Sequence, residues 1–221
     1  MAGPLKLATK YQVDALRSQI IKHLERDWPS TIDDWDRVDD DTHKKRLAAL
    51  QSSDESLDGV VPDPVYTILL ARLCDVPQIL PTAFYVLSRQ PTKPKICPVL
   101  SKAHIHSRTL LGIDDMENLA LGRENIARKI SSSDLLDIDN WSPCAGVCGR
   151  YIWTVWGELL QGMIVDKDPL RVLLSELRGL RNASPEYGVD LCATCQHKMG
   201  NNIIDARSTL FNSLSDMFEL V

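Results

Sequence analysis

Apolar residues recur every three or four positions along much of this chain, a spacing that places them on one face of an α-helix. The clearest run covers residues 196–220, where Met199, Ile203, Leu210 and Leu214 keep this spacing. Few segments alternate apolar and polar residues as a half-buried β-strand does. The pattern predicts a mainly α fold, an irregular multi-helix domain. The final stripe is short for a coiled-coil dimer, so we expect it to pack within the chain.

Two Asp-Pro steps predict helix starts. Asp63 precedes Pro64, and Asp168 precedes Pro169. In each pair the aspartate can accept a hydrogen bond from the first helical turn, and the proline stands where its missing N–H costs nothing. A further helix is expected to follow Pro77 and to bury five apolar side chains, those of Ile79, Leu80, Ala83, Phe84 and Leu87.

Three other helices are predicted, over residues 5–26, 42–50 and 114–130. The first should end at Trp28, because a residue that precedes a proline disfavours helical geometry. Its apolar stripe consists of Val13, Leu16, Ile20 and Leu24. The third offers three apolar residues for burial, Met116, Leu119 and Ile126.

Acidic residues dominate the segment 30–60, which we expect to be a solvated linker around the short helix 42–50. Its aspartates are Asp33, Asp34, Asp36, Asp39, Asp40, Asp41, Asp54 and Asp58. The segment lacks the alternating oxygen ligands, the central glycine and the final glutamate of an EF-hand calcium loop. These aspartates are therefore predicted to form a charged, solvated face.

The loop 90–107 lies in a stretch without acidic residues. It carries Lys93, Lys95 and Lys102, and Arg108 follows it. Such a loop can contact phosphate or an acidic partner, but it lacks the interleaved aromatic residues that stack on bases. We expect a solvated loop, with nucleic-acid contact as the alternative.

Composition changes this picture little. The chain has 25 Lys and Arg against 30 Asp and Glu, a formal net charge of -5, which removes the general electrostatic attraction to nucleic acids. No run is apolar enough to span a membrane, and the first residues lack the apolar region of a secretory signal. We therefore expect a cytoplasmic or nuclear protein, with no nucleic-acid or membrane partner, in which thiols stay reduced.

Four of the six cysteines form two close pairs, Cys144 with Cys148 and Cys192 with Cys195. Zinc binds four thiolates in a tetrahedron, and each pair can supply two of them from a single turn. We predict a zinc site that holds a small C-terminal subdomain, with His197 as a substitute ligand if one cysteine points away. Two alternatives stay open: burial of the cysteines as small apolar residues, and redox or disulfide chemistry.

The predicted zinc would have a structural role, because four protein ligands leave no open coordination position for water or substrate. The sequence also lacks the nucleophile-elbow, phosphate-loop, dinucleotide-binding and metalloprotease signatures. We therefore expect no enzymatic activity. Cys74 and Cys97 lack a close partner and are expected in the core or in a loop. Trp153 and Trp156 are predicted to pack in the core, with partner binding as the alternative.

Four segments share their patterns with one protein family. Residues 7–16 contain the pattern Ala-x-Lys-Tyr-x-Val-x-x-Leu, which follows the sheet of BTB domains. Residues 71–81, 122–124 and 191–195 are similar to the region after that domain. The chain thus resembles BTB/POZ domain-containing proteins of basidiomycete fungi from the last part of the BTB core onward. Because most of this core is missing, dimerisation and cullin binding are not carried over.

The resemblance implies four parts. They are a remnant of the late helical segment of the BTB domain (1–29), an acidic linker (30–60), a helical post-BTB region (61–130) and a helical C-terminal subdomain with paired cysteines (131–221). The resemblance implies a non-enzymatic scaffold for an unidentified protein partner. The competing hypothesis is a zinc-dependent nucleic-acid-binding or transcription-related regulator.

Overall fold

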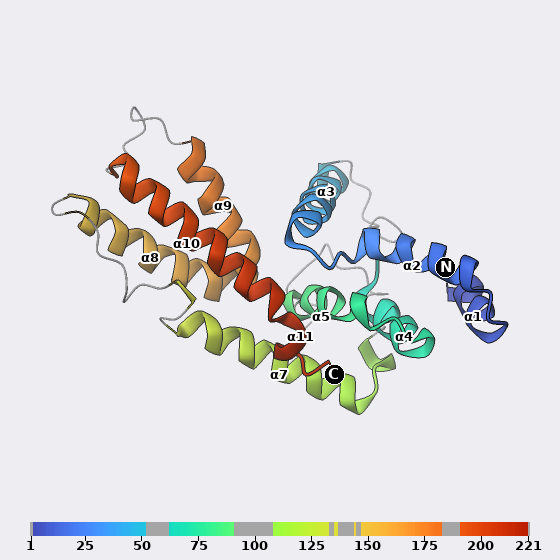
Figure 1. The fold of residues 1–221 in the computed structure, drawn as a ribbon. Coiled ribbons are helices and arrows are strands. Elements are labelled where there is room, and N and C mark those ends of the chain that lie inside the picture. The colour runs from blue at the N-terminus through green and yellow to red at the C-terminus, as the bar shows by residue number, and fades with distance from the viewer. Residues whose placement is uncertain are drawn as a thin grey trace. The chain divides into compact units, whose positions relative to one another are not determined.

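The computed structural model describes residues 2–51, 62–90, 108–132, 135–136, 144, 147–182 and 191–220. Every regular element in these residues is a helix, so the prediction of a mainly α fold is confirmed (Figure 1). The chain divides into two compact units. Unit 1 consists of Met1–Arg123 and Leu214–Val221, and unit 2 consists of Glu124–Ser213.

Unit 1 contains the helices of the first half of the chain and a short helix from its end. Its elements are α1 (Ala2–Lys10), α2 (Asp14–Asp27), α3 (Ile32–Gln51), α4 (Pro64–Cys74), the 3₁₀ helix η1 (Pro77–Ile79), α5 (Leu80–Arg89), the 3₁₀ helix η3 (Arg108–Leu110), the first part of α7 (Ile113–Ser131) and α11 (Leu214–Met217).

Helices α4 and α5 carry much of the core of unit 1. The Asp63 side chain accepts a hydrogen bond of 2.8 Å from the backbone N–H of Val65, so the predicted helix start is confirmed. All five apolar residues predicted for the helix after Pro77 are buried. Phe84 also packs against Phe218, with ring centroids 5.5 Å apart. Helix α11 therefore brings its apolar side chains to the same core as α5.

The predicted single helix over residues 5–26 is two helices. Gln12 adopts a left-handed conformation with φ of 54°, and the Val13 N–H donates to the Ala8 carbonyl at 2.9 Å. This pattern closes a helix end, usually with glycine in the left-handed position. Because the helix is interrupted here, the predicted stripe does not face the core along its whole length. Val13 and Leu16 are 46% and 42% exposed, whereas Ile20 and Leu24 are buried. Helix α2 ends before Trp28, as predicted.

The short helix predicted over 42–50 is wrong in extent, because α3 begins at Ile32 and takes in most of the acidic segment. The backbone N–H of Asp34 donates to the Thr31 hydroxyl at 3.3 Å, which caps the helix. Acidic residues in the first turn are favourable there, since the N-terminal end of a helix carries partial positive charge. The expected solvated face is also incomplete, because Asp39 is buried and accepts a hydrogen bond of 3.3 Å from Arg89.

Two arginines close the C-terminal end of α5. Arg123 donates to the carbonyl oxygens of Ser88 and Gln90, each at 3.1 Å, and Arg108 donates to the same Gln90 oxygen at 3.1 Å. Burial lowers the pKa of both guanidinium groups, and the charge of Arg123 lowers that of Arg108 further. The carbonyls at the end of α5 supply the compensating negative end of the helix dipole.

Helix α7 confirms part of its predicted burial. Leu119 and Ile126 are buried, whereas Met116 is 45% exposed, so its predicted burial is wrong. Arg72 of α4 donates to Asp115 at 3.1 Å, which fixes the first turn of α7 on α4. Around the helix, Met116 is turned about 100° from Asp115, whereas Leu119 is turned only about 40° and therefore shares the buried face.

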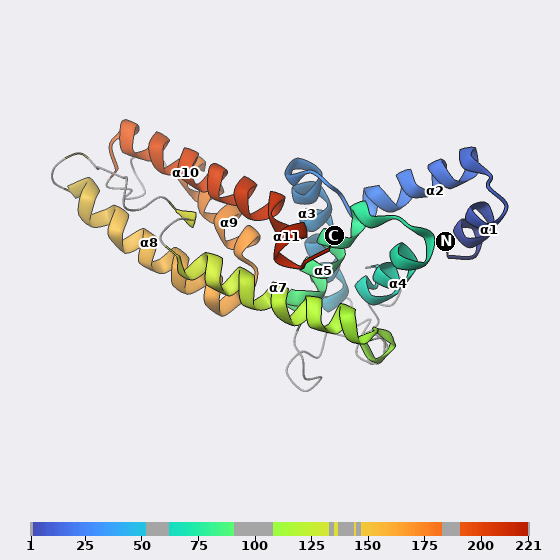
Figure 2. The same ribbon diagram turned by 60° about the horizontal axis from the view of Figure 1, so that its bottom comes forward.

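Unit 2 contains the rest of α7 and three long helices, α8 (Val147–Asp166), α9 (Pro169–Asn182) and α10 (Ala193–Asn212). Helix α9 packs against both α8 and α10 and runs opposite to them (Figure 2). The backbone N–H of Arg171 donates to Asp168 at 3.3 Å, so the second predicted Asp-Pro start is confirmed as well.

The stripe of α10 and one face of α8 supply the core of unit 2. Met199, Ile203 and Leu210 are fully buried, which confirms packing within the chain. Trp156 is buried as predicted, but Trp153 is 58% exposed, so its predicted core position is wrong. None of the helices in the described part of the chain combines the length and the apolar composition that a membrane span requires.

Candidate metal centre

The two cysteine pairs lie at the N-terminal ends of two helices of unit 2. Cys144 precedes α8, and Cys148 is in its first turn. Cys192 is the N-cap residue of α10, and Cys195 is in the first turn that follows. Because α8 and α10 run in the same direction, these ends lie together (Figure 1). Two pairs that are distant in sequence thus form one cluster.

The cluster has the dimensions of a tetrahedral metal site. All four Sγ atoms lie within 4.8 Å of one another. The Sγ of Cys144 lies 3.6 Å from that of Cys192 and 3.5 Å from that of Cys195. Zinc with Zn–S bonds of about 2.3 Å requires sulfur atoms about 3.8 Å apart. The arrangement of the four thiols therefore fits a zinc ion without rearrangement of the helices.

Backbone donors favour the thiolate form of one cysteine of the cluster, Cys192. The Cys192 N–H donates to the Cys148 Sγ at 3.3 Å. The pKa of Cys192 is lowered to about 7. The largest cause is a hydrogen bond from the backbone N–H of Cys195, and the second is a hydrogen bond with the Cys144 side chain. The N-terminal ends of α8 and α10 add partial positive charge, which stabilises thiolates.

One thiol of the cluster holds its proton more tightly. Hydrogen bonds with Cys148, Cys195 and Cys192, in that order of size, raise the pKa of Cys144 to about 12. A proton shared in this way is displaced when a metal ion binds the thiolates, so binding releases protons. Cys148 and Cys195 are buried, whereas Cys144 and Cys192 are exposed, which leaves one side of the site open for an ion to enter.

Other candidate ligands lie outside the cluster. His197 follows the second pair closely but belongs to a different face of α10, where Asn201 Nδ2 lies 3.3 Å from its Nε2. Cys74 is buried in α4 of unit 1, as expected for a core cysteine. Cys97 lies outside the described residues.

The basic loop predicted over 90–107 lies, from residue 91 onward, outside the described part of the chain. Its neighbour Arg108 is described, and its guanidinium is half-buried on the carbonyls that end α5. The Arg108 guanidinium is therefore used inside its unit and does not add to a phosphate-binding surface. The sequence did not predict this role of Arg108, because the groups that accept its hydrogen bonds are backbone carbonyls, which every residue carries.

Comparisons of the chain with protein-family models, with curated proteins and with solved structures find no match.

Proposed function

We propose that this chain is a non-enzymatic protein-interaction module whose unit 2 is held by a structural zinc ion. The ion would be bound by Cys144, Cys148, Cys192 and Cys195. The observation that carries the proposal is the convergence of four thiols within 4.8 Å at the ends of two helices. Bound there, zinc would supply folding free energy and fix the N-terminal ends of α8 and α10 side by side.

Exposed apolar side chains support the interaction role. Tyr66, Ile113 and Trp153 are 59%, 78% and 58% exposed, and each stands on a helix that is otherwise packed in its unit. Tyrosine and tryptophan are enriched among the residues that contribute most to the binding energy of protein interfaces. The same role is implied by the resemblance to the helical region of BTB/POZ proteins.

Metal analysis of the purified full chain tests the zinc centre. We expect about one zinc per chain in the parent, and less than a fifth of that in the double variant Cys144→Ser and Cys192→Ser, because two ligands cannot retain the ion. Cys74→Ala is the matched control, since it removes a thiol from unit 1 and should leave the zinc content unchanged.

Chelation provides a second readout. Addition of a strong chelator to the parent should lower the melting temperature, and the serine variant should already melt at the lower value. Equal zinc in the parent and the serine variant, or a parent refolded with zinc that holds none, would contradict the metal centre.

Site-specific photo-crosslinking tests the interaction role. A photoreactive amino acid at Trp153 should give a discrete cross-linked partner that excess unlabelled chain competes away, whereas the same group at the exposed Lys198 should not give this product. A recombinant form of that partner should then bind the parent more strongly than Trp153→Ala. Equal binding by both would remove Trp153 from the interaction surface.

A further inference from the structure

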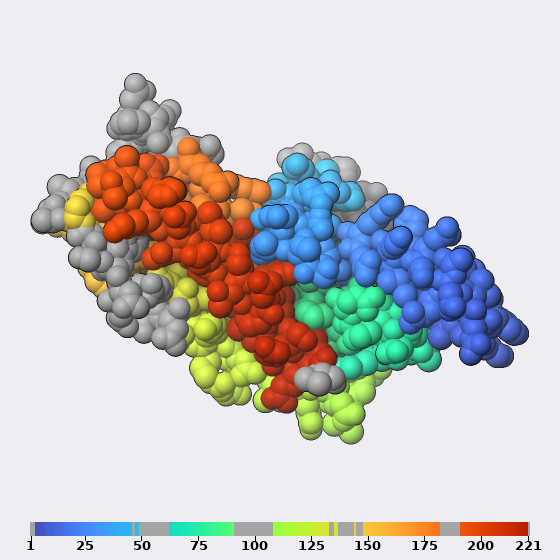
Figure 3. Space-filling view, viewed as in Figure 1, coloured from blue at the N-terminus to red at the C-terminus, as the bar shows by residue number. Residues whose placement is uncertain are grey.

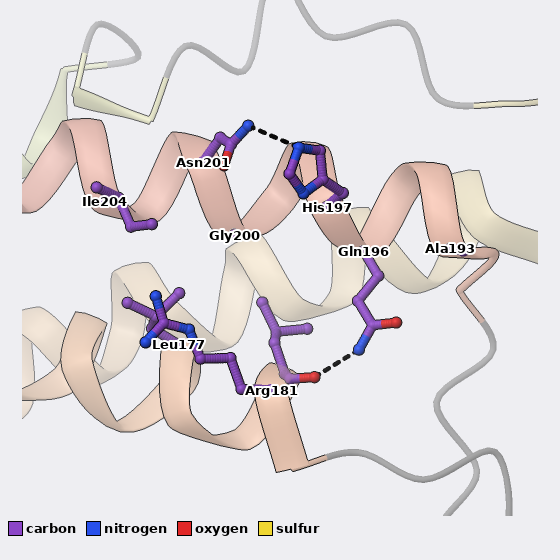
Figure 4. A pocket seen from close by; sticks show the side chains of 9 residues that line it. Leu177, Arg181, Ala193, Gln196, His197, Gly200, Asn201 and Ile204 are labelled. Atoms are coloured by element: carbon purple, nitrogen blue, oxygen red, sulfur yellow. Dashed lines mark hydrogen bonds between the residues drawn. The ribbon is translucent and has the colours of Figure 1, made fainter.

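A groove of about 380 Å³ lies between α9 and α10 (Figure 4). The buried side chains of Leu177 and Leu180 form its apolar floor, and the partly exposed Ile204 lies at one end. Figure 3 shows α9 and α10 side by side at the surface of the molecule. The groove volume is within the range of ligand sites in proteins.

Gly200 keeps the middle of this groove open. A Cβ at this position would lie 3.8 Å from Leu177 Cδ1, an ordinary contact, so alanine fits there. Any longer side chain would extend into the space between the helices. Glycine in a helix interior costs about 1 kcal/mol relative to alanine, and its backbone here is not in the left-handed region. Gly200 therefore keeps space open in the groove, and its presence lowers the stability of helix α10.

The polar side chains that line the groove differ in whether they bridge its two helices or face solvent. Gln196 donates to the Leu180 carbonyl near the C-terminal end of α9 and is used in that contact. His197 and Asn201 stand together on the α10 side, and Arg181 stands on the α9 side (Figure 4). All three are exposed. None of the described residues that line the groove is acidic, although the chain carries a net charge of -5.

This chemistry fits an acidic and apolar ligand. A guanidinium pairs with a carboxylate through two parallel hydrogen bonds, and imidazole and amide groups bind peptide groups. The lining residues of α10 run from Ala193 to Ile204, about 16 Å along the helix. Five residues of an extended peptide cover the same length, at about 3.3 Å each. The groove therefore has the length of a peptide segment.

We propose that this groove binds a short acidic segment of a partner protein. Its carboxylate would pair with Arg181, and an adjacent apolar side chain would lie over Leu177 and Gly200. The inference rests on the proposed function, because the α10 wall of the groove begins at Ala193, between the metal-site candidates Cys192 and Cys195.

Selection from a random library tests the proposal. The zinc-loaded full chain is used to select five-residue sequences displayed on phage, and the enriched sequences are made as free peptides. We expect an aspartate or glutamate next to a leucine, isoleucine or phenylalanine. Replacement of the acidic residue by its amide should weaken binding at least tenfold, since it removes the charge that pairs with Arg181. Enrichment without an acidic residue, or none at all, would overturn the proposal.

Variants of the chain locate the bound peptide. Arg181→Gln and Gly200→Leu should each weaken binding at least tenfold, the first by loss of charge and the second by filling the groove. Lys198→Gln is the matched control, because it removes a positive charge from an exposed position of α10 outside the groove. Equal affinity of Arg181→Gln and the parent would overturn the proposal.

Nuclear magnetic resonance distinguishes other occupants. The peptide should shift the Gly200 amide resonance, whereas 4-methylvalerate should shift it at only far higher concentration. If this small carboxylate binds as tightly as the peptide, or if concentration-dependent self-association produces the same shift, the peptide assignment is wrong. Zinc content and melting temperature are measured on the same samples. A zinc-loaded chain that selects no peptide overturns the groove alone, whereas a chain without zinc overturns the metal centre.

Discussion

Phe218 occupies the space that a side chain at Gly122 would need. A Cβ at Gly122 would lie 1.8 Å from Phe218 Cδ1, closer than any real contact. Gly122→Ala should therefore displace a fully buried ring that also packs on Phe84, and we expect a loss of about 1–3 kcal/mol in the free energy of unfolding. Urea unfolding of the purified variant measures this loss.

A second glycine provides the control for that prediction. Gly179 is exposed within α9, and a Cβ there meets nothing within 4 Å. Gly179→Ala should increase stability by up to about 1 kcal/mol, because alanine has the higher helix propensity. If both glycine variants change stability in the same direction, the packing of Phe218 against Gly122 is not as described.

The two tryptophans of α8 should respond very differently to truncation. Trp156 is 1% exposed and Trp153 is 58% exposed. We expect Trp156→Ala to lower the free energy of unfolding by about 3–5 kcal/mol, and Trp153→Ala to change it by less than about 0.5 kcal/mol. Thermal and urea unfolding of both variants give the comparison. A large loss in Trp153→Ala would mean that this side chain is buried.

Removal of one partner from the ion pair between Arg89 and Asp39 should lower the free energy of unfolding, because both side chains are mostly buried, at 13% and 10% exposed. The guanidinium also lies over the rings of Trp35 and Tyr85, with its carbon 5.2 Å and 5.0 Å from their centroids. Arg89→Met should cost about 1–3 kcal/mol in urea unfolding, because the Asp39 carboxylate loses this charged donor.

An exposed ion pair is the control for Arg89→Met. Arg37 and Asp34 pair on the surface of α3, and their side chains are 79% and 45% exposed. Arg37→Met should change the free energy of unfolding by less than about 1 kcal/mol, since surface pairs contribute little. Equal losses in the two methionine variants would contradict the importance of burial.

The carboxyl of Glu176 should make the stability of unit 2 depend on pH. Burial, and then the negative charge of Glu158, raise its pKa above the usual 4.5. A raised pKa in the folded chain means that its contribution to stability is fully present below pH 4.5 and is lost as the pH rises through the folded value. Glu176→Gln should therefore raise the melting temperature at pH 7 and have less effect at pH 4.

The variant Glu158→Gln separates the two causes of the raised Glu176 pKa, which are burial and the charge of Glu158. It removes only the repulsion, the smaller cause, so we expect a smaller rise in melting temperature at pH 7 than for Glu176→Gln. A scan of melting temperature from pH 4 to pH 8 checks both variants. A lower melting temperature of Glu176→Gln at pH 7 would contradict the raised pKa.

Local signals in the sequence predicted the features that depend on neighbouring residues. The caps at Asp63 and Asp168 need only an acceptor and the following turn, and both were confirmed. The cysteine pairs carried a spacing that indicates metal ligands, and the four residues do converge. The zinc itself stays a prediction.

Features that depend on distant residues were missed. A glutamine at position 12 gives no sign of the left-handed turn, which glycine would have marked. Trp153 and Trp156 differ in direction by about 60° around α8, so the packing of unit 2 around this helix decides which one is buried. The groove between Leu177 and Gly200 likewise requires two helices to come together, and neither one carries a motif for it.

The order of the two units along the chain has a consequence for biosynthesis. In the sequence, the residues of unit 2 come after the first segment of unit 1 and before its second segment. A ribosome therefore completes all of unit 2 before it adds Phe218, which fills part of the core beside Phe84. A premature stop codon after residue 213 would spare the cysteine cluster and yet damage the unit that was synthesised first.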